Sequence, residues 1–128
     1  MSAYLLDTNA LYWLMTDNPA LGPATRVRLT DAASVYYSAA SIWELEMKRL
    51  RGRLGDIGPF DRITPATGLI ELPVTAEHAR SIGQTAVPHH DPFDRLLLTQ
   101  ATVEELRFVT AGRALLGLER ADVLDARR

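Results

Sequence analysis

Cysteine is absent from this chain of 128 residues. Its absence excludes a disulfide framework and thiolate metal ligands, and it is typical of proteins that work in a reducing cytoplasm. Long apolar runs are missing too, because no window approaches the roughly 18 apolar residues of a membrane-spanning helix. The start MSAYLLD has neither the basic segment nor the apolar stretch of a secretion signal. We therefore expect a cytoplasmic protein that makes no contact with a membrane.

An excess of positive charge is also lacking. Lys and Arg number 14 against 16 Asp and Glu, which gives a formal net charge of −2. This balance excludes a general electrostatic grip on nucleic acid, so a nucleic-acid enzyme would need local basic patches. The length and the hydrophobic content of 47% predict one domain, residues 1–128, with a sizeable core.

The sequence does contain an alternation of short β-rich runs and helical patterns. Strands are predicted at residues 4–6, 34–37, 69–72, 107–109 and 123–124. Helices are predicted at residues 9–16, 23–32, 41–51, 76–84, 92–106 and 114–118, and a loop with one helical turn at 55–68. This order indicates an α/β fold, with parallel strands joined by right-handed crossovers and helices on both faces of the sheet.

The first apolar run, AYLL, ends on a carboxylate at Asp7. In sheets of this kind, ligands bind beyond the carboxyl ends of the strands, which is the edge that Asp7 occupies. The plainer interpretation is that Asp7, or its neighbour Asn9, caps the helix that follows.

Two further acids, Glu44 and Asp94, are expected in the first turns of later helices. Ser41 and Glu44 match the S-x-x-E capping box, and Asp91 before a proline matches a helix cap with Asp94 two residues beyond that proline. Each acid could therefore serve only to start a helix, where the dipole favours negative charge. Ser41 and Asp91 can do the capping themselves, however, which leaves Glu44 and Asp94 available for other work.

Together, the three acids suggest a metal site. If their strands are neighbours, Asp7, Glu44 and Asp94 gather at one edge of one sheet. Like charges so placed need a cation or a raised pKa. Carboxylate oxygens suit Mg²⁺ or Mn²⁺, and such an ion can activate water and stabilise charge on a phosphoryl group. The pattern therefore predicts a metal-dependent phosphodiesterase site.

Four segments in order, LLDTNALYWL, SAASIWELEMKRLRGRLG, VPHHDPFDRLLLTQA and RFVTAGRALL, resemble PIN-domain proteins, and among them the VapC-like toxins of bacterial toxin–antitoxin modules. The resemblance covers residues 4–124. It implies a three-layer α/β/α sandwich with a mostly parallel sheet, and a Mg²⁺- or Mn²⁺-dependent RNA endonuclease acting on tRNA, rRNA or mRNA. It also implies a homodimer that a cognate antitoxin protein silences, in a heterotetramer or a larger assembly.

The resemblance assigns catalytic roles to three residues: Asp7, Glu44 and Asp94. Asp7 and Asp94 would hold the metal, directly or through water, and Glu44 would position or deprotonate the attacking water. Attack in line on phosphorus would leave a 3′-hydroxyl and a 5′-phosphate. The polar residues that support the first acid and complete the last motif match Thr8, Asn9 and Thr110.

One position departs from the family pattern. The family often reads threonine, any residue, aspartate after the fourth strand, whereas this chain reads Thr110-Ala111-Gly112. Three acids predict one metal ion, and Asp91 either caps its helix or assists through a water. The missing acid keeps a second hypothesis open, a PIN-fold binding module with little or no activity. A phosphotransfer domain is disfavoured because no second Asp follows two residues after Asp7.

The predicted RNA contacts are basic residues near the second and third motifs. Lys48, Arg49 and Arg51 could track phosphates, or they could compensate the helix dipole on a solvated face. Lys48 also stands four residues after Glu44, in the favoured orientation for a helical ion pair. Arg95 could face the substrate phosphate or pair with a neighbouring acid.

Overall fold

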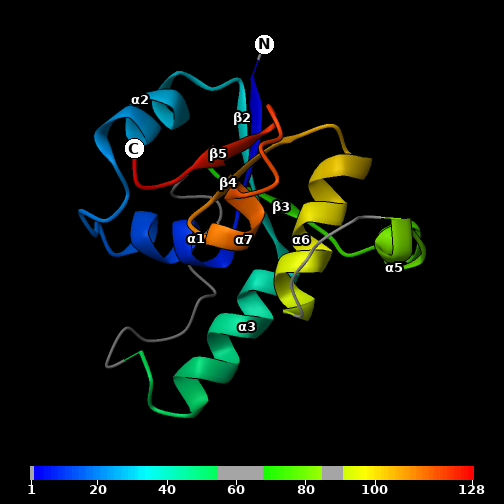
Figure 1. Ribbon diagram of the computed structural model, residues 1–128. Helices are drawn as coiled ribbons and strands as arrows, with labels where there is room; N and C mark the ends of the chain where they lie inside the picture. The colour runs from blue at the N-terminus through cyan, green and yellow to red at the C-terminus, as the bar shows by residue number, and fades with distance from the viewer. Residues whose placement is uncertain (1, 55–67, 85–90) are drawn as a thin grey trace.

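The computed structural model describes residues 2–54, 68–84 and 91–128. Its strands are β1 (Ala3–Leu6), β2 (Ser34–Ser38), β3 (Ile70–Leu72), β4 (Arg107–Thr110) and β5 (Val123–Asp125). Within those ranges they form one five-stranded sheet in the order β3-β2-β1-β4-β5, and every pair is parallel (Figure 1). All of the strands lie where the apolar runs predicted them.

Helices connect these strands and cover both faces of the sheet, which confirms the three-layer α/β/α architecture (Figure 1). They are α1 (Thr8–Met15), α2 (Pro23–Asp31), α3 (Ala39–Leu50), α5 (Ala76–Ser81), α6 (Pro92–Val103) and α7 (Arg113–Leu116). The single helix predicted at 76–84 divides into α5 and the 3₁₀ turn η2 (Ile82–Gln84). Apart from Gly68, the loop predicted at 55–68 lies outside the described residues.

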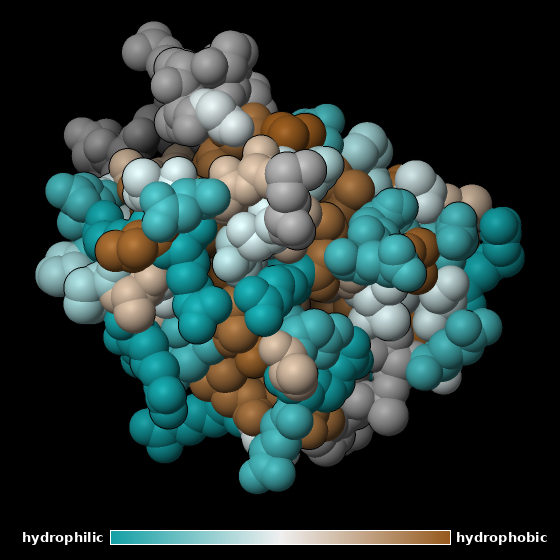
Figure 2. Space-filling view, turned by 90° about the horizontal axis from the view of Figure 1, so that it is seen from above, coloured by the Kyte–Doolittle hydropathy of each residue, from teal (hydrophilic) through white to brown (hydrophobic). Residues whose placement is uncertain are grey.

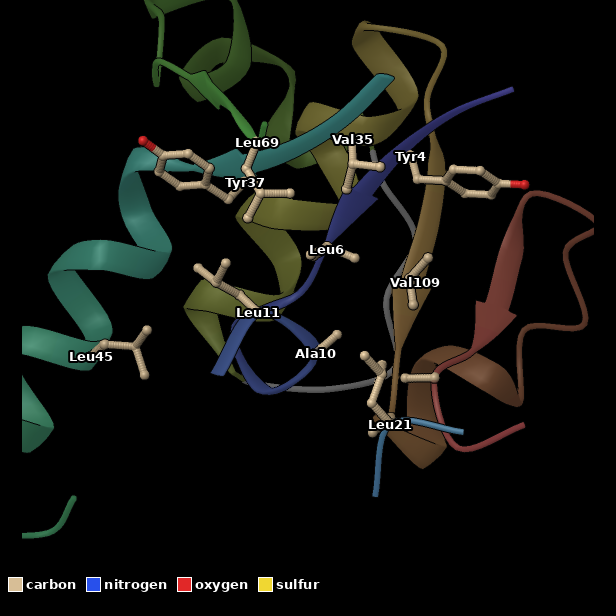
Figure 3. Packing of buried hydrophobic residues seen from close by; sticks show 12 residues of the cluster. Tyr4, Leu6, Ala10, Leu11, Leu21, Val35, Tyr37, Leu45, Leu69 and Val109 are labelled. Carbon is tan, nitrogen blue, oxygen red and sulfur yellow. The ribbon is translucent and has the colours of Figure 1, made fainter. Parts of the chain in front are cut away.

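The three central strands, β1, β2 and β4, are largely buried, as expected for a parallel sheet between two helical layers, whereas β3 and β5 at the edges are more exposed. Tyr4 and Leu6 of β1 point into one apolar cluster, where they meet Leu11 of α1 (Figure 3). Leu5, between them, points to the opposite cluster, which includes Leu97 of α6. The alternation along β1 thus fixes which helices cover which face, because successive side chains of a strand point in opposite directions.

The order of the strands changes direction at β1. The chain leaves β1 through α1 and α2 to reach β2 on one side, and β4 lies on the other side of β1. Leu6 is paired with Tyr37 of β2 and with Val109 of β4. A crevice beyond the carboxyl ends of β1 and β4 is the usual ligand site in such sheets. Asp7 stands at this point, and its N–H donates to Val109 O at 2.9 Å.

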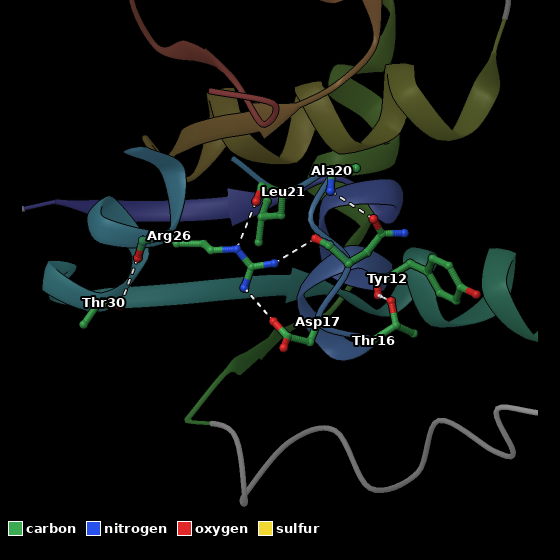
Figure 4. Close-up of polar contacts among 8 residues, drawn as sticks. Tyr12, Thr16, Asp17, Ala20, Leu21, Arg26 and Thr30 are labelled. Carbon is green, nitrogen blue, oxygen red and sulfur yellow. Dashed lines mark hydrogen bonds and ion pairs between the residues drawn. The ribbon is translucent and has the colours of Figure 1, made fainter. Parts of the chain in front are cut away.

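The turn between α1 and α2 is held by the guanidinium of Arg26 (Figure 4). Its Nε donates to Leu21 O at 2.9 Å, and its Nη2 donates to Asn18 O at 2.7 Å. Its Nη1 pairs with the carboxylate of Asp17, whose φ of 50° lies in the left-handed region. These contacts fix α2 against the end of α1.

The predicted start of the third helix was wrong. Its N-cap is Ser38, whose hydroxyl accepts from Ala40 N–H at 3.0 Å, so Ser41 does not form a capping box with Glu44. The helix begins at Ala39, which places Glu44 in the second turn rather than the first. Alanine is the strongest helix former, and two alanines extend the helix upstream of the apolar pattern.

Hydrophilic residues surround a band of apolar residues on the face seen from above in the orientation of Figure 1 (Figure 2). Among the described residues, no helix has the length and hydropathy needed to cross a bilayer.

Candidate active site

Asp7 is the buried centre of the site. Asp7 directly follows β1 and is only 3% exposed. Oδ1 accepts from Ala10 N–H at 2.7 Å, which confirms that Asp7 caps α1. Oδ2 accepts from the Thr110 hydroxyl at 2.7 Å and from Ala111 N–H at 3.2 Å. The carboxylate therefore joins the ends of β1 and β4 while it starts a helix.

Burial raises the pKa of Asp7 to about 6. The hydrogen bonds from Ala10, Thr110 and Ala111 act in the opposite direction, and the negative charge of Asp94 adds to the rise. Hydrogen bonds alone thus do not offset the cost of an ionised carboxylate in this place. A cation bound beside it would favour the ionised form.

Asp94 is the third residue of α6, and its charge acts on Asp7. The helix is capped by Asp91, whose Oδ1 accepts from the N–H groups of Phe93 at 2.9 Å and Asp94 at 3.4 Å. This confirms Asp91 as the cap. A Cβ atom placed on Gly112 would lie 3.8 Å from Asp94 Oδ2 and 3.3 Å from Thr110 Oγ1. Gly112 therefore borders the same space as the two carboxylates.

Glu44 is held by its own helix. Its Oε2 lies 3.5 Å from Nζ of Lys48, and its side chain is 18% exposed. The helical ion pair expected from their spacing is therefore present. Within the described ranges, no three His, Cys, Asp or Glu side chains are close enough together to hold a metal ion. The structure brings Asp94 to Asp7 and leaves Glu44 in its pair with Lys48.

Two buried hydroxyl groups join the helices that follow β1 and β2. Thr8 Oγ1 lies 2.9 Å from Ser41 Oγ, which fixes α1 against α3. Asn9 follows Thr8 and is exposed to solvent. The sequence patterns predicted that Ser41 caps a helix, whereas its hydroxyl contacts Thr8. The two residues are 33 positions apart, so no local spacing in the sequence indicates the contact.

A second buried bond joins α3 to α6. The hydroxyl of Ser38 donates to Gln100 Oε1 at 2.6 Å, and both residues are completely buried. Ser38 is the last residue of β2 and the N-cap of α3, so this bond connects the start of the helix that carries Glu44 to the helix that carries Asp94. Sequence analysis did not select Gln100, although a glutamine inside the apolar run LLLTQA is a signal that could have found it.

Arg127 contacts the segment after β4, and no sequence pattern indicated this role. Its Nη1 donates to Ala111 O at 2.8 Å, and its guanidinium carbon lies 5.5 Å from the centre of the Trp13 ring. Because Ala111 N–H binds Asp7, this arginine braces the segment that holds the buried carboxylate.

The basic residues of the second and third motifs differ in their surroundings. Arg49 forms an ion pair of 2.7 Å with Glu46, whereas Arg51 is exposed. Arg95 has a buried Nε without a hydrogen-bond partner in the described part of the chain. Arg51 is therefore accessible to an anionic ligand, and Arg95 is partly enclosed.

Comparison with known proteins places this geometry in a family. The sequence model of the PIN domain matches residues 4–122. No curated protein matches the sequence. A chain of the crystal structure of VapBC2 from Rickettsia felis, bound to a DNA fragment from their promoter, is similar with a TM-score of 0.60 and 13% identity, over 95% of this chain and 96% of that chain. A chain of a toxin–antitoxin complex from Klebsiella pneumoniae is similar with a TM-score of 0.60 and 16% identity, over 96% and 97% of the two chains. At these identities the similarity shows a shared fold.

Proposed function

This chain belongs to the PIN domain family, and on that premise we propose that it is an RNA endonuclease that depends on Mg²⁺ or Mn²⁺. The observation that carries the proposal is the buried carboxylate of Asp7, fixed by three hydrogen bonds where β1 meets β4 and acted on by the charge of Asp94. A residue that only capped a helix would need neither the burial of Asp7 nor the nearby charge of Asp94.

The side chains at this edge fit a hard divalent cation. Asp7 and Asp94 offer only oxygen ligands, and Mg²⁺ is commonly bound through one or two carboxylates while it keeps several waters. A pair of acids therefore suffices for one ion, although no three-acid group is present in the described ranges. We propose that Asp7 and Asp94 hold this ion, with Thr8, Asn9 and Thr110 in support.

When bound, the ion would polarise a non-bridging phosphate oxygen and lower the pKa of a water molecule. The hydrogen bonds from Thr110 and Ala111 lower the pKa of Asp7, against the effect of burial, and fix its carboxylate where β1 and β4 end. Glu44 would orient the attacking water and accept its proton, with Lys48 holding the carboxylate in place. Attack in line on phosphorus would leave a 3′-hydroxyl and a 5′-phosphate.

We further propose that the chain is the toxin of a toxin–antitoxin pair and forms a homodimer. The sequence motifs support this assignment, and so does the fold, which is shared with chains of VapBC2 and of a toxin–antitoxin complex. The cognate antitoxin would bind it in a heterotetramer or a larger assembly. The proposed substrates, tRNA, rRNA or mRNA, place its action in the cytoplasm.

Cleavage of a mixed tRNA and rRNA pool by the purified chain tests the proposal. The reactions contain Mg²⁺, Mn²⁺ or EDTA, with Asp7→Asn and Asp94→Asn proteins as matched controls of unchanged side-chain size. We expect cleavage that needs the metal and is lost in both variants. Cleavage that survives both substitutions, or that proceeds in EDTA, would refute the assignment of these two acids.

Gly112 supports a second candidate function, a binding module with little or no nuclease activity. The glycine borders the space between Asp94 and Thr110, where an acidic side chain would point into the site. If the folded wild-type chain cleaves no RNA with either metal, this candidate takes precedence and a protein partner becomes the object of the search.

A further inference from the structure

Trp43 is a large aromatic residue on the surface of α3, with 62% of the residue exposed. It directly precedes Glu44 in the sequence, and Leu45, two residues after Trp43, is 1% exposed. The indole is therefore turned away from the core that Leu45 enters. In Figure 1, α3 extends away from the sheet.

The Trp43 ring is not isolated, because it rests against Phe93 of α6. The two ring centres lie 5.4 Å apart with an interplanar angle of 65°, an edge-to-face contact. Phe93 directly precedes Asp94, as Trp43 precedes Glu44. Two rings from two helices thus meet, and each directly precedes one of the proposed catalytic acids in the sequence. Phe93 is partly buried and packs against the core cluster that contains Leu97, so the Trp43 ring rests on a residue that is itself supported by the core.

We propose that Trp43, backed by Phe93, is a stacking platform for an unpaired nucleobase next to the phosphate that is cleaved. This inference rests on the proposed ribonuclease function and adds a substrate subsite to it. Aromatic side chains that bind single-stranded RNA stack on bases that a duplex would hide, and the stacking tolerates different bases. The substrate class is therefore RNA with an unpaired nucleotide at the cleavage site.

The local distribution of charge along α3 fits this occupant. A net charge of −2 gives no general attraction for phosphates, so the affinity for RNA must come from local contacts. Beyond Trp43, the last turn of α3 carries Lys48 and Arg49, which pair with acids of the same helix, and Arg51 directly after the helix is exposed. A strand whose base stacks on Trp43 can run its phosphates past these cations while its scissile phosphate faces the acids.

Binding of a short oligouridylate in EDTA tests the platform without cleavage. We expect Trp43→Leu to weaken binding roughly tenfold, which corresponds to about 1.4 kcal/mol, and Trp43→Phe to restore most of the affinity. Leu50→Ala is the matched control, because Leu50 is 72% exposed on the same helix and lies almost two turns further from the acids. In a Trp13→Phe protein, where Trp43 is the one remaining tryptophan, oligouridylate should also quench the indole fluorescence.

Unchanged affinity of Trp43→Leu, or an equal loss with Leu50→Ala, would overturn the platform. A change of sedimentation in Trp43→Leu with unchanged RNA affinity would likewise overturn it and assign the ring to a protein contact. Neither readout depends on cleavage. If the chain binds oligouridylate through Trp43 but cuts no RNA, the nuclease proposal is refuted and the platform stands. If the chain cuts RNA but shows none of these effects at Trp43, the platform is refuted and the nuclease proposal stands.

Discussion

The hydroxyl of Thr110 donates a hydrogen bond of 2.7 Å to Oδ2 of Asp7, across 103 positions of the sequence. The same hydroxyl oxygen accepts from Gly112 N–H at 3.0 Å. Thr110 therefore connects the buried acid to the position where the family often carries another. Its place at the end of β4, beside β1, makes this contact possible.

Replacement of this threonine should weaken the site in two ways. Thr110→Val keeps the shape but removes the donor to Asp7, so the pKa of Asp7 should rise further. A buried group that loses its partner costs about 1–3 kcal/mol, and we expect the free energy of unfolding to fall by that amount. Urea denaturation measures the change, with Thr110→Ser as the control that keeps the hydroxyl. Equal stability of the valine and wild-type proteins would contradict the role given to this bond.

The raised pKa of Asp7 predicts a particular pH dependence in EDTA. The folded chain binds this proton more tightly than the unfolded chain, in which the carboxyl has its ordinary pKa near 3.8. The contribution of Asp7 to stability therefore falls as pH rises from about 4 to about 6, by about 3 kcal/mol in total, and stays lost above that range.

Asp7→Asn cannot ionise, and it should flatten this part of the profile. The difference between the unfolding free energies of the two proteins, measured from acidic to neutral pH, isolates the contribution of Asp7. Parallel profiles for wild-type and Asp7→Asn would show that burial does not raise this pKa.

Introduction of the missing acid should strengthen metal binding. The backbone of Gly112, with φ −71° and ψ 118°, suits any residue, and a Cβ there would approach Asp94 Oδ2 to 3.8 Å. Gly112→Asp should bind Mn²⁺ roughly tenfold more tightly, a gain of about 1.4 kcal/mol, and should be less stable without metal because like charges meet. Titration beside Gly112→Asn separates charge from size. Equal Mn²⁺ affinity of the two variants would contradict the placement of Gly112 at the site.

The bond between Ser38 and Gln100 should couple the two helices that carry Glu44 and Asp94. Each single change, Ser38→Ala or Gln100→Ala, should destabilise the chain by about 1–3 kcal/mol, since each leaves a buried polar partner. The double variant should lose less than the sum of the two, with a coupling of about 0.5–3 kcal/mol in a double-mutant cycle. Additive losses would mean that this bond does not join α3 to α6.

Local patterns predicted the strands and the places of Asp7 and Asp94 because these features depend on near neighbours, but they placed Glu44 one turn too early in its helix. The run before Asp7 is apolar and short, and Asp91 is followed by a proline that suits the first helical position. The family resemblance then predicted the order of layers, and the Lys48 pair followed from helical spacing.

The contacts that shape the site could not be predicted in this way. Thr8 meets Ser41, and Ser38 meets Gln100, only because the fold brings separate helices together. Two serines three residues apart, each followed by helix-forming residues, offered two helix starts, and the apolar pattern selected the wrong one. The Ala111 N–H that binds Asp7 belongs to the backbone, and the identity of the residue therefore does not indicate this contact.

Titration of the metal-free chain with Mn²⁺, followed by the electron paramagnetic resonance signal of the free ion, tests the two-carboxylate site most directly. The site described here predicts one saturable Mn²⁺ ion per chain in the wild-type protein and its loss in both Asp7→Asn and Asp94→Asn, while Asp91→Asn keeps it. No saturable binding by the folded wild-type chain, or equal binding by all four proteins, would contradict a metal centre at Asp7 and Asp94.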